Sequence, residues 1–454
     1  MRIERLIILA LGGILLWALW KLYKGKVRKL WQRVKDHMPR QWRPKSPEDC
    51  PWCQEELELL TIPNPPDVTP YCQQKSPRGR KKTIATQGFA CPEVTCKYFG
   101  MTDETVHALV GYGKLGTNQD IQRFKCQVCG GTFSSRKGTP LYYVKTPTGE
   151  MEEVLWYLAE GVDISVLVRR TGHKEETLSQ WLNRMGEHSA RLHDLIFRQL
   201  ALDLVQMDEL YAKVRGTDET RWLWLAIDPV SKILPALHLG GRRATDAYAL
   251  VHELKRRLCA TCVPAFTTDG LRAYFHAVTA HFGRWFRPPR ARKDHWQVAE
   301  DLLHGQLVKR RQNRKVKYTI TRMLWGKRRD LYDVLEQFGF NRLVQTAFIE
   351  RVNLTIRQGI SLLTRRTWSL AQTDEHLVNH VQWWRCYYHF IRPHATLCDS
   401  TPGIPPAQRE RTPAMAAGLT DHIWTVEEVL RLPLLTRLGG SHAAESSART
   451  ACAA

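Results

Sequence analysis

The residues best suited to chemistry in this chain of 454 residues are carboxylates that stand where strands are expected. In the stretch 203–214, DLVQMDELYAKV, side chains alternate as in a strand, so Gln206, Asp208 and Leu210 are expected on one face. Asp and Glu are uncommon in strands, and carboxylate oxygens are preferred ligands of hard cations such as Mg²⁺. The pair Asp208-Glu209 therefore indicates either a metal site or a solvated acid on an edge strand.

A second carboxylate, Asp269, ends a later stretch of strand character. The elements expected up to that point are strands at 221–229 and 232–240, a helix at 245–258, and a buried strand at 263–270. Three antiparallel strands, a helix and a fourth strand resemble the order of the ribonuclease-H-like fold, in which strands one and four are neighbours. Asp208 and Asp269 would then meet, and two adjacent carboxylates repel each other unless a cation lies between them.

The third acid of such a site is expected on a helix within residues 341–372. Apolar residues recur there at helical spacing and form a buried stripe: Ile349, Val352, Ile356, Ile360 and Leu363. Glu350, Asn353 and Arg357 share another face, which can present an acid to a metal and an Arg to a phosphate. The competing acids are Glu300, Asp301 and Asp228, the last expected off the metal-binding edge. Glu350 is preferred.

Four further residues have the spacing of a structural zinc site: Cys91, Cys96, Cys126 and Cys129. Each short spacing lets two thiolates meet one tetrahedral Zn²⁺, and a Gly after the last Cys permits a tight turn. Seven of the twelve cysteines lie within residues 50–129, which indicates reduced metal ligands rather than a secreted disulfide scaffold. The role of the remaining three, Cys50, Cys53 and Cys72, stays open between a partner-completed zinc site and ordinary cysteines.

Residues 146–200 have the pattern of three helices, with a Gly-containing turn at 171–173 before the longest. A short helix, such a turn and a longer helix are typical of a helix-turn-helix unit, whose second helix enters the major groove of DNA. An ordinary helical hairpin is the alternative. The residues expected to face DNA in this unit are Lys174, Gln180 and Arg184.

The net charge of +22 indicates a polyanionic partner, with nucleic acid as the first candidate and an anionic membrane as the second. Residues 281–330 hold fifteen Lys and Arg against four Asp and Glu. We interpret about 283–340 as a basic insertion that adds DNA contacts, with tryptophans interleaved. The further residues expected to bind DNA are Arg310, Arg311, Arg314, Lys315 and Arg357.

The N-terminal segment is apolar, with fifteen uninterrupted apolar or Gly residues at 6–20. At about 1.5 Å per residue, this helix is short for a hydrocarbon core of about 30 Å. Residues 6–23 are therefore either an inner-membrane tether that leaves the body in the cytoplasm or an extension from an upstream start codon. Apart from this segment, a cytoplasmic, nucleoid-associated protein is expected.

Five stretches in this order resemble the DDE transposases of bacterial insertion sequences, in the group with an N-terminal zinc ribbon and helix-turn-helix. They are LVQMDELYAKV, RWLWLAID, AFTTDGLRAYF, FIERVNLTIRQGISLLTRRTWS and YYHFIRPHATL. The likeness covers roughly residues 85–400. It implies that Asp208, Asp269 and Glu350 hold two Mg²⁺ or Mn²⁺ ions, which cleave DNA at the ends of the element and transfer the strands to target DNA. The gap of 81 residues between Asp269 and Glu350 is longer than in the compact form of the motif.

The resemblance implies a multidomain α/β protein, with a ribonuclease-H-like mixed sheet and flanking helices preceded by the zinc ribbon and helix-turn-helix. The expected parts are an apolar helix and basic linker (1–48), a zinc-ribbon region (49–145), a helix-turn-helix (146–200), a catalytic domain (201–400) and a partly disordered tail (401–454). DNA, namely terminal inverted repeats and target, is the expected partner, and a homo-oligomer is expected when two ends are paired. The alternatives are a catalytically inactive DNA-binding regulator and a sequence-nonspecific nuclease on the same fold.

Overall fold

The computed structural model describes residues 70–71, 84–116, 121–216, 220–289, 293–313, 315–367, 369–399, 405 and 409–434. Several predictions lie outside these residues: the apolar segment 6–23, the three open cysteines, the DNA contact at Arg314 and the end of the tail. The side chains of Arg311 and Lys315 lie outside them as well. No helix within the described part of the chain is long and apolar enough to cross a membrane.

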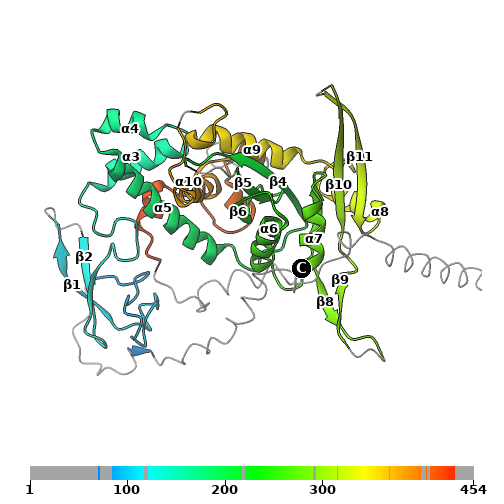
Figure 1. Ribbon diagram of the computed structural model, residues 1–454. Coiled ribbons are helices and arrows are strands. Elements are labelled where there is room, and N and C mark those ends of the chain that lie inside the picture. The colour runs from blue at the N-terminus through cyan, green and yellow to red at the C-terminus, as the bar shows by residue number, and fades with distance from the viewer. Residues whose placement is uncertain are drawn as a thin grey trace, which may run out of the picture.

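The fold is mixed α/β and contains a six-stranded mixed sheet with flanking helices, as predicted (Figure 1). Its strands, in sheet order, are β11 (Lys315–Trp325), β10 (His304–Gln312), β7 (Ala265–Thr268), β4 (Leu204–Ala212), β5 (Arg221–Ile227) and β6 (Ala236–Gly240). β4 and β7 are parallel neighbours, and so are β7 and β10, whereas the other pairs are antiparallel. The prediction that the strands bearing Asp208 and preceding Asp269 are adjacent is therefore confirmed.

Helices cover both faces of this sheet. The side chains of β4 alternate between the two faces, as the sequence predicts, and apolar side chains on each face pack against helices. Val205 and Met207 pack in one core with α6 (Ala244–Arg257) and α7 (Arg272–His281). Leu210 packs on the opposite face, with α9 (Ala347–Gly359) and part of α10 (Asp374–Cys386). All five residues of the stripe predicted on α9 and the turn that follows it are buried.

The structure differs from the predictions most in two regions, at the start of β6 and in the basic segment. β6 begins only at Ala236, because Pro235 has no N–H to donate and the carbonyl oxygens of Leu234 and Pro235 accept hydrogen bonds of 2.8 Å each from the buried Arg385. The basic segment predicted as an insertion is not wholly separate from the sheet, since its strand β10 pairs with β7. Beyond that pairing, β10 and β11 continue as a long hairpin that projects from the body (Figure 1).

The described residues N-terminal to the six-stranded sheet form a small three-stranded sheet and three helices. Their bounds are β1 (Leu109–Leu115), β2 (Ile121–Cys126), β3 (Thr132–Ser134), α3 (Thr148–Ala159), α4 (Ile164–Thr171) and α5 (Glu175–Ile196). α4 begins where the Asp163 carboxylate accepts from the backbone N–H of Ser165 and ends at Gly172, whose φ of 77° favours glycine. α5 packs tightly on α10, because the Gly186 position faces the backbone of Asn379 with no room for a side chain.

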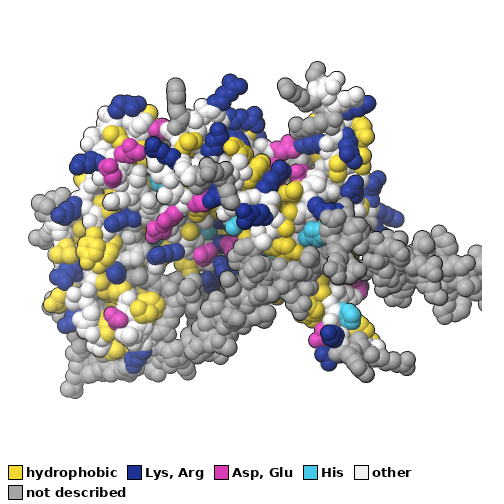
Figure 2. Space-filling view, viewed as in Figure 1, with side chains coloured by type: hydrophobic (Ala, Val, Ile, Leu, Met, Phe, Trp, Pro, Cys, Tyr) yellow, Lys and Arg dark blue, Asp and Glu magenta, His cyan; other side chains and the backbone are white. Residues whose placement is uncertain are grey.

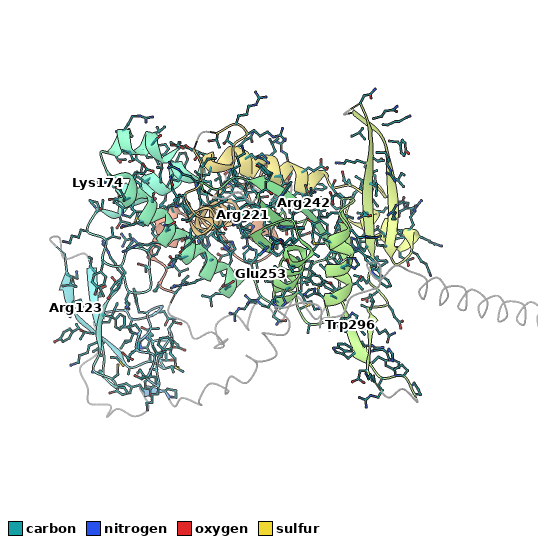
Figure 3. The ribbon with its side chains drawn as sticks, in the orientation of Figure 1. Arg123, Lys174, Arg221, Arg242, Glu253 and Trp296 are labelled. Atoms are coloured by element: carbon teal, nitrogen blue, oxygen red, sulfur yellow. The ribbon has the colours of Figure 1, made fainter. Side chains whose placement is uncertain are left out.

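The remaining elements of the described residues are β8 (Gly283–Phe286), β9 (His295–Val298), α8 (Arg328–Gln337), the π-helix η5 (Tyr387–Ile391), α11 (Pro413–Ala416), α12 (Val426–Arg431) and two short 3₁₀ helices at Ser361–Leu363 and Ala395–Leu397. β8 and β9 form a separate two-stranded hairpin, on which Trp296 is labelled in Figure 3.

Candidate active site

Three carboxylates converge where β7 ends beside β4. Asp269 follows the last residue of β7, and Asp208 lies in the middle of β4. Oxygen atoms of Asp208, Glu209 and Asp269 all lie within 4.8 Å of one another. The predicted meeting of Asp208 with Asp269 is thus observed, and Glu209 joins them.

The Asp208 carboxylate faces α9, where Asn353 Nδ2 donates a hydrogen bond of 2.9 Å to its Oδ2. Burial, followed by the charges of Glu209, Asp269 and Glu350, raises the pKa of Asp208 to about 7. A buried carboxyl surrounded by other acids is the arrangement that a divalent cation relieves, so these residues fit a metal ion.

Glu209 is fixed from the other side of the sheet. Its side chain is 2% exposed, and its Oε1 accepts from Arg242, with an Nε–Oε1 distance of 3.0 Å. The buried Tyr274 hydroxyl on α7 donates to Oε2 at 3.1 Å. Arg242, labelled in Figure 3 beside the central sheet, also stacks over the Trp222 ring at 4.5 Å. Burial and then the Asp269 charge raise the pKa of Glu209, although Arg242 opposes both.

Glu350 lies in the first turn of α9, outside the group of three carboxylates. It is close enough to Asp208 to contribute to the raised pKa of that acid. Its own carboxylate pairs with Lys309 of β10 and accepts a hydrogen bond of 2.7 Å from the Thr346 hydroxyl. Glu350 therefore lies near the site, but its carboxylate forms an ion pair with Lys309.

The competing acid Asp228 lies elsewhere. Its carboxylate accepts from the backbone N–H groups of Val230 and Ser231, at 3.0 and 2.9 Å, and from the Ser231 hydroxyl. These bonds stabilise the turn after β5, which accounts for this acid without a metal.

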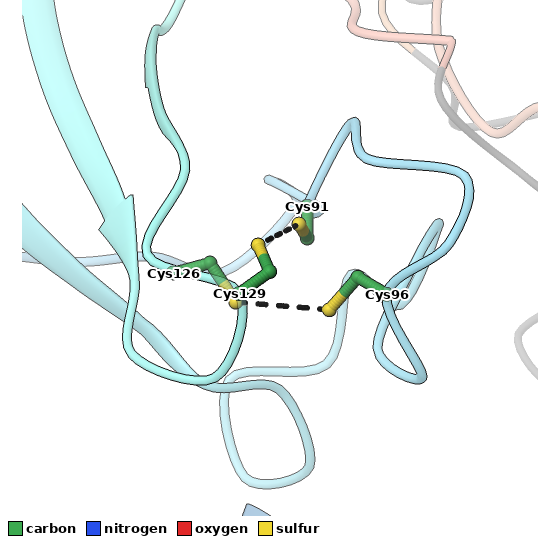
Figure 4. Close-up of side chains that lie close together, drawn as sticks. All are labelled: Cys91, Cys96, Cys126 and Cys129. Carbon is green, nitrogen blue, oxygen red and sulfur yellow. Dashed lines mark hydrogen bonds between the residues drawn. The ribbon is translucent and has the colours of Figure 1, made fainter.

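The four predicted cysteines gather into one cluster (Figure 4). The Sγ atoms of Cys91 and Cys129 are 3.6 Å apart, and those of Cys96 and Cys126 are 3.9 Å apart. Four sulfurs around a tetrahedral ion with metal–sulfur bonds of about 2.3 Å would be separated by roughly 3.8 Å, so the cluster fits such an ion. Gly130, with a φ of 74°, forms the tight turn that brings the second pair into place.

No family model matches the chain, and no curated protein matches it.

The predicted DNA contacts lie on several elements. Lys174 and Gln180 are exposed at the start of α5, and Arg310 is exposed on β10. Arg184 is also exposed, although its guanidinium donates to the Tyr142 carbonyl at 2.7 Å. Arg357 is half-buried and donates to the carbonyl of Leu363 at 3.0 Å. Figure 2 shows Lys and Arg side chains along the β10–β11 hairpin and acidic side chains where that hairpin meets the body.

Glu209 was not predicted as a member of the triad, although the adjacent acids at 208 and 209 are a signal for it. Of this pair the family resemblance implied Asp208 alone, and neighbouring residues of a strand point to opposite faces. Because β7 stops at Thr268 while β4 continues to Ala212, side chains from both faces reach the point beyond its end. The arrangement as a whole can bind a hard cation next to a basic surface.

Proposed function

We propose that this protein is a DDE transposase, which cleaves DNA at the ends of an insertion sequence and joins those ends to target DNA. The observation that carries the proposal is the convergence of Asp208 and Asp269 at neighbouring parallel strands, with Glu350 on the helix that covers β4. The sheet order β6-β5-β4-β7-β10 supports a ribonuclease-H-like domain, because the first and fourth strands of that domain are neighbours.

The proposed roles follow from the positions of the residues. Asp208 and Asp269 bind metal and Glu350 completes the site, while Asn353 orients Asp208 through its amide. Two divalent cations bound there supply activation of a water or 3′-hydroxyl and stabilisation of the leaving 3′-oxygen. Lys and Arg of the β10–β11 hairpin neutralise DNA phosphates, which gives salt-dependent affinity.

The N-terminal parts supply DNA recognition in this proposal. The four-cysteine cluster with β1–β3 is a zinc ribbon, and α3–α5 contain the helix-turn-helix. Lys174 stands at the start of the proposed recognition helix α5, but so do the acidic Glu175 and Glu176. Exposed acids weaken attraction to phosphates, so contacts here depend on base edges more than on charge.

The decisive experiment is a joining assay with radiolabelled element ends and a plasmid target in Mg²⁺ or Mn²⁺. The wild-type protein is expected to nick and join, and Asp269→Asn and Glu350→Gln are expected to do neither. Joining by either variant at the wild-type rate would remove that residue from the triad. Specific binding without cleavage in any divalent metal would favour the inactive regulator, and degradation without joining would favour a nuclease.

The zinc ribbon makes a separate prediction. Cys126→Ser is expected to lower the bound zinc by one ion per chain and to unfold the small sheet, because a four-cysteine zinc site supplies about 10 to 16 kcal/mol of apparent binding free energy in isolated fingers. Zinc is measured by plasma mass spectrometry, and unfolding by new tryptic cleavage at Arg123 and Lys125 on β2. Cys259→Ser, outside the cluster, is the matched control. Unchanged zinc content in Cys126→Ser would contradict the assignment.

A further inference from the structure

We propose that Glu209 is a ligand of the first divalent cation to bind this site, together with Asp208 and Asp269, and that Glu350 joins only when DNA draws Lys309 away. This inference rests on the proposed function, because it assigns an order to the assembly of the same metal site. It adds a fourth carboxylate to the predicted triad, and it assigns to Lys309 the role of keeping Glu350 away from the metal until DNA binds.

The position of Glu209 supports its assignment as a metal ligand. An oxygen of Glu209 lies within 4.8 Å of oxygens of both Asp208 and Asp269, whereas Glu350 is outside this group. The Glu209 side chain is only 2% exposed, so burying its negative charge beside two other acids costs folding free energy. A bound cation would offset this cost.

The hydrogen bonds of Glu209 leave it free to bind a cation. A carboxylate offers about four lone-pair sites. Arg242 donates to Oε1 through two nitrogens, and Tyr274 donates to Oε2. One site on Oε2 remains, and metal-ligating carboxylates are commonly oriented by hydrogen bonds of this kind. Arg242 and Tyr274 thus hold Glu209 in place.

Asn353 gives a second, independent sign of a ligand. Its Nδ2 donates to Asp208, and its side-chain Oδ1 is buried without a hydrogen-bond partner within the described residues. A buried amide oxygen that lacks a donor is costly. Amide oxygens are also ligands of hard cations, so an ion beside Asp208 would satisfy this atom directly or through a bound water.

Lys309 accounts for the delayed entry of Glu350. Its ammonium pairs with Glu350, and it lies on the basic strand β10, next to Arg310. DNA phosphates on this hairpin compete with Glu350 for the same ammonium, since both are anions. When a phosphate takes Lys309, the Glu350 carboxylate is released one helical turn from Asn353 and turns toward Asp208.

The test is Mn²⁺ binding by the full-length, zinc-loaded protein, measured by electron paramagnetic resonance with and without a DNA duplex. Without DNA, Glu209→Gln is expected to weaken Mn²⁺ binding by about 10-fold or more, a loss typical of altered metal sites. Glu350→Gln is expected to leave it unchanged. With DNA present, Glu350→Gln is expected to weaken binding as well. Lys309→Met is expected to make DNA-free binding depend on Glu350.

Glu209→Asp retains the charge but shortens the side chain, and it is expected to weaken DNA-free binding too, which guards against misfolding of the Gln variant. Equal weakening by Glu350→Gln and Glu209→Gln without DNA would overturn the proposal. So would wild-type affinity in both Glu209 variants. If Asp208→Asn also bound Mn²⁺ normally, the metal site itself, and with it the proposed function, would fail.

Discussion

Asp208→Asn is expected to abolish DNA cleavage and, at the same time, to make the protein more stable. The loss of cleavage is expected to reach about three orders of magnitude or more, because a neutral amide in place of the carboxylate would weaken the binding of the cations that the proposed mechanism requires. The gain in stability comes from removing a buried charge that lies among other acids.

The size of the gain follows from the pKa. Asp208 titrates at about 7 in the folded protein, against an ordinary value of 3.8. At pH 7.5 without metal, ionisation of this buried group costs about 2 to 4 kcal/mol, which Asn does not incur. Between pH 4 and 7 the unfolded chain ionises Asp208 before the folded protein does, so the contribution of this one group to the stability of the wild type falls as pH rises. The advantage of Asn should therefore be near zero at pH 4 and full above pH 7.

Thermal unfolding in Mg²⁺-free buffer at pH 7.5 measures this effect, with an expected rise in melting temperature of roughly 5 to 10 °C for Asp208→Asn over the wild type. Asp374→Asn is a suitable control, because that exposed carboxylate pairs with Arg221 and its loss should not stabilise the protein. A lower melting temperature for Asp208→Asn at pH 7.5 would show that the acid cluster is not strained in the absence of metal. Added Mg²⁺ is expected to raise the melting temperature of the wild type alone.

Sequence patterns were sufficient to predict those features of the structure that depend on residues close together in the chain. Strand alternation placed Asp208 toward α9 and Met207 toward the opposite core, and short spacings identified the four cysteines. The order of strands and helices, through its likeness to the ribonuclease-H-like fold, predicted that Asp208 and Asp269 would meet. Each of these features depends on local periodicity or on the sequential order of elements, both of which the chain displays directly.

Other features depend on distances that only the folded chain defines. The pairing of Lys309 with Glu350 joins residues 41 positions apart, and the Arg385 guanidinium reaches carbonyls about 150 positions away. The basic segment looked like an insertion because charge hides strand periodicity, yet His304 to Gln306 pair with β7. Glu209 lies in the acid cluster because β7 ends one residue before Asp269, so that side chains from both faces of β4 can approach Asp269.

Mild acid is expected to unfold this protein steeply, because several buried histidines in the described part of the chain have a strongly lowered pKa, among them the following five. Burial lowers the pKa of each: to about 4 for His188 and His380, to about 3 for His304, and well below the ordinary value for His193 and His389. Since the unfolded chain takes up these protons near pH 6.5, stability is present above that pH and is lost as pH falls. Asp208 acts in the opposite direction, because its raised pKa keeps up to one proton bound in the folded protein that the unfolded chain releases.

The pair His193 and His389 shows why protonation is so costly. His193 Nδ1 donates to the Ser189 carbonyl, so its Nε2 accepts from His389 Nδ1 at 3.0 Å. His389 Nε2 in turn accepts from the Leu234 N–H at 2.8 Å. Both rings are thus neutral with assigned tautomers, and an added proton would place two donors face to face.

The five histidines and Asp208 by themselves give an expected net uptake of about four protons on unfolding between pH 6 and 5, equivalent to about 5 kcal/mol per pH unit. Urea titrations at several pH values measure it, and the slope of unfolding free energy against pH counts the protons. His380→Gln should lower that count by one, whereas His422→Gln should not lower it, because the exposed His422 has a raised pKa from its bonds to Asp421 and Glu428. An uptake of one proton or fewer would mean that these buried rings are already charged in the folded protein, which the hydrogen bonds of His193 and His389 do not allow.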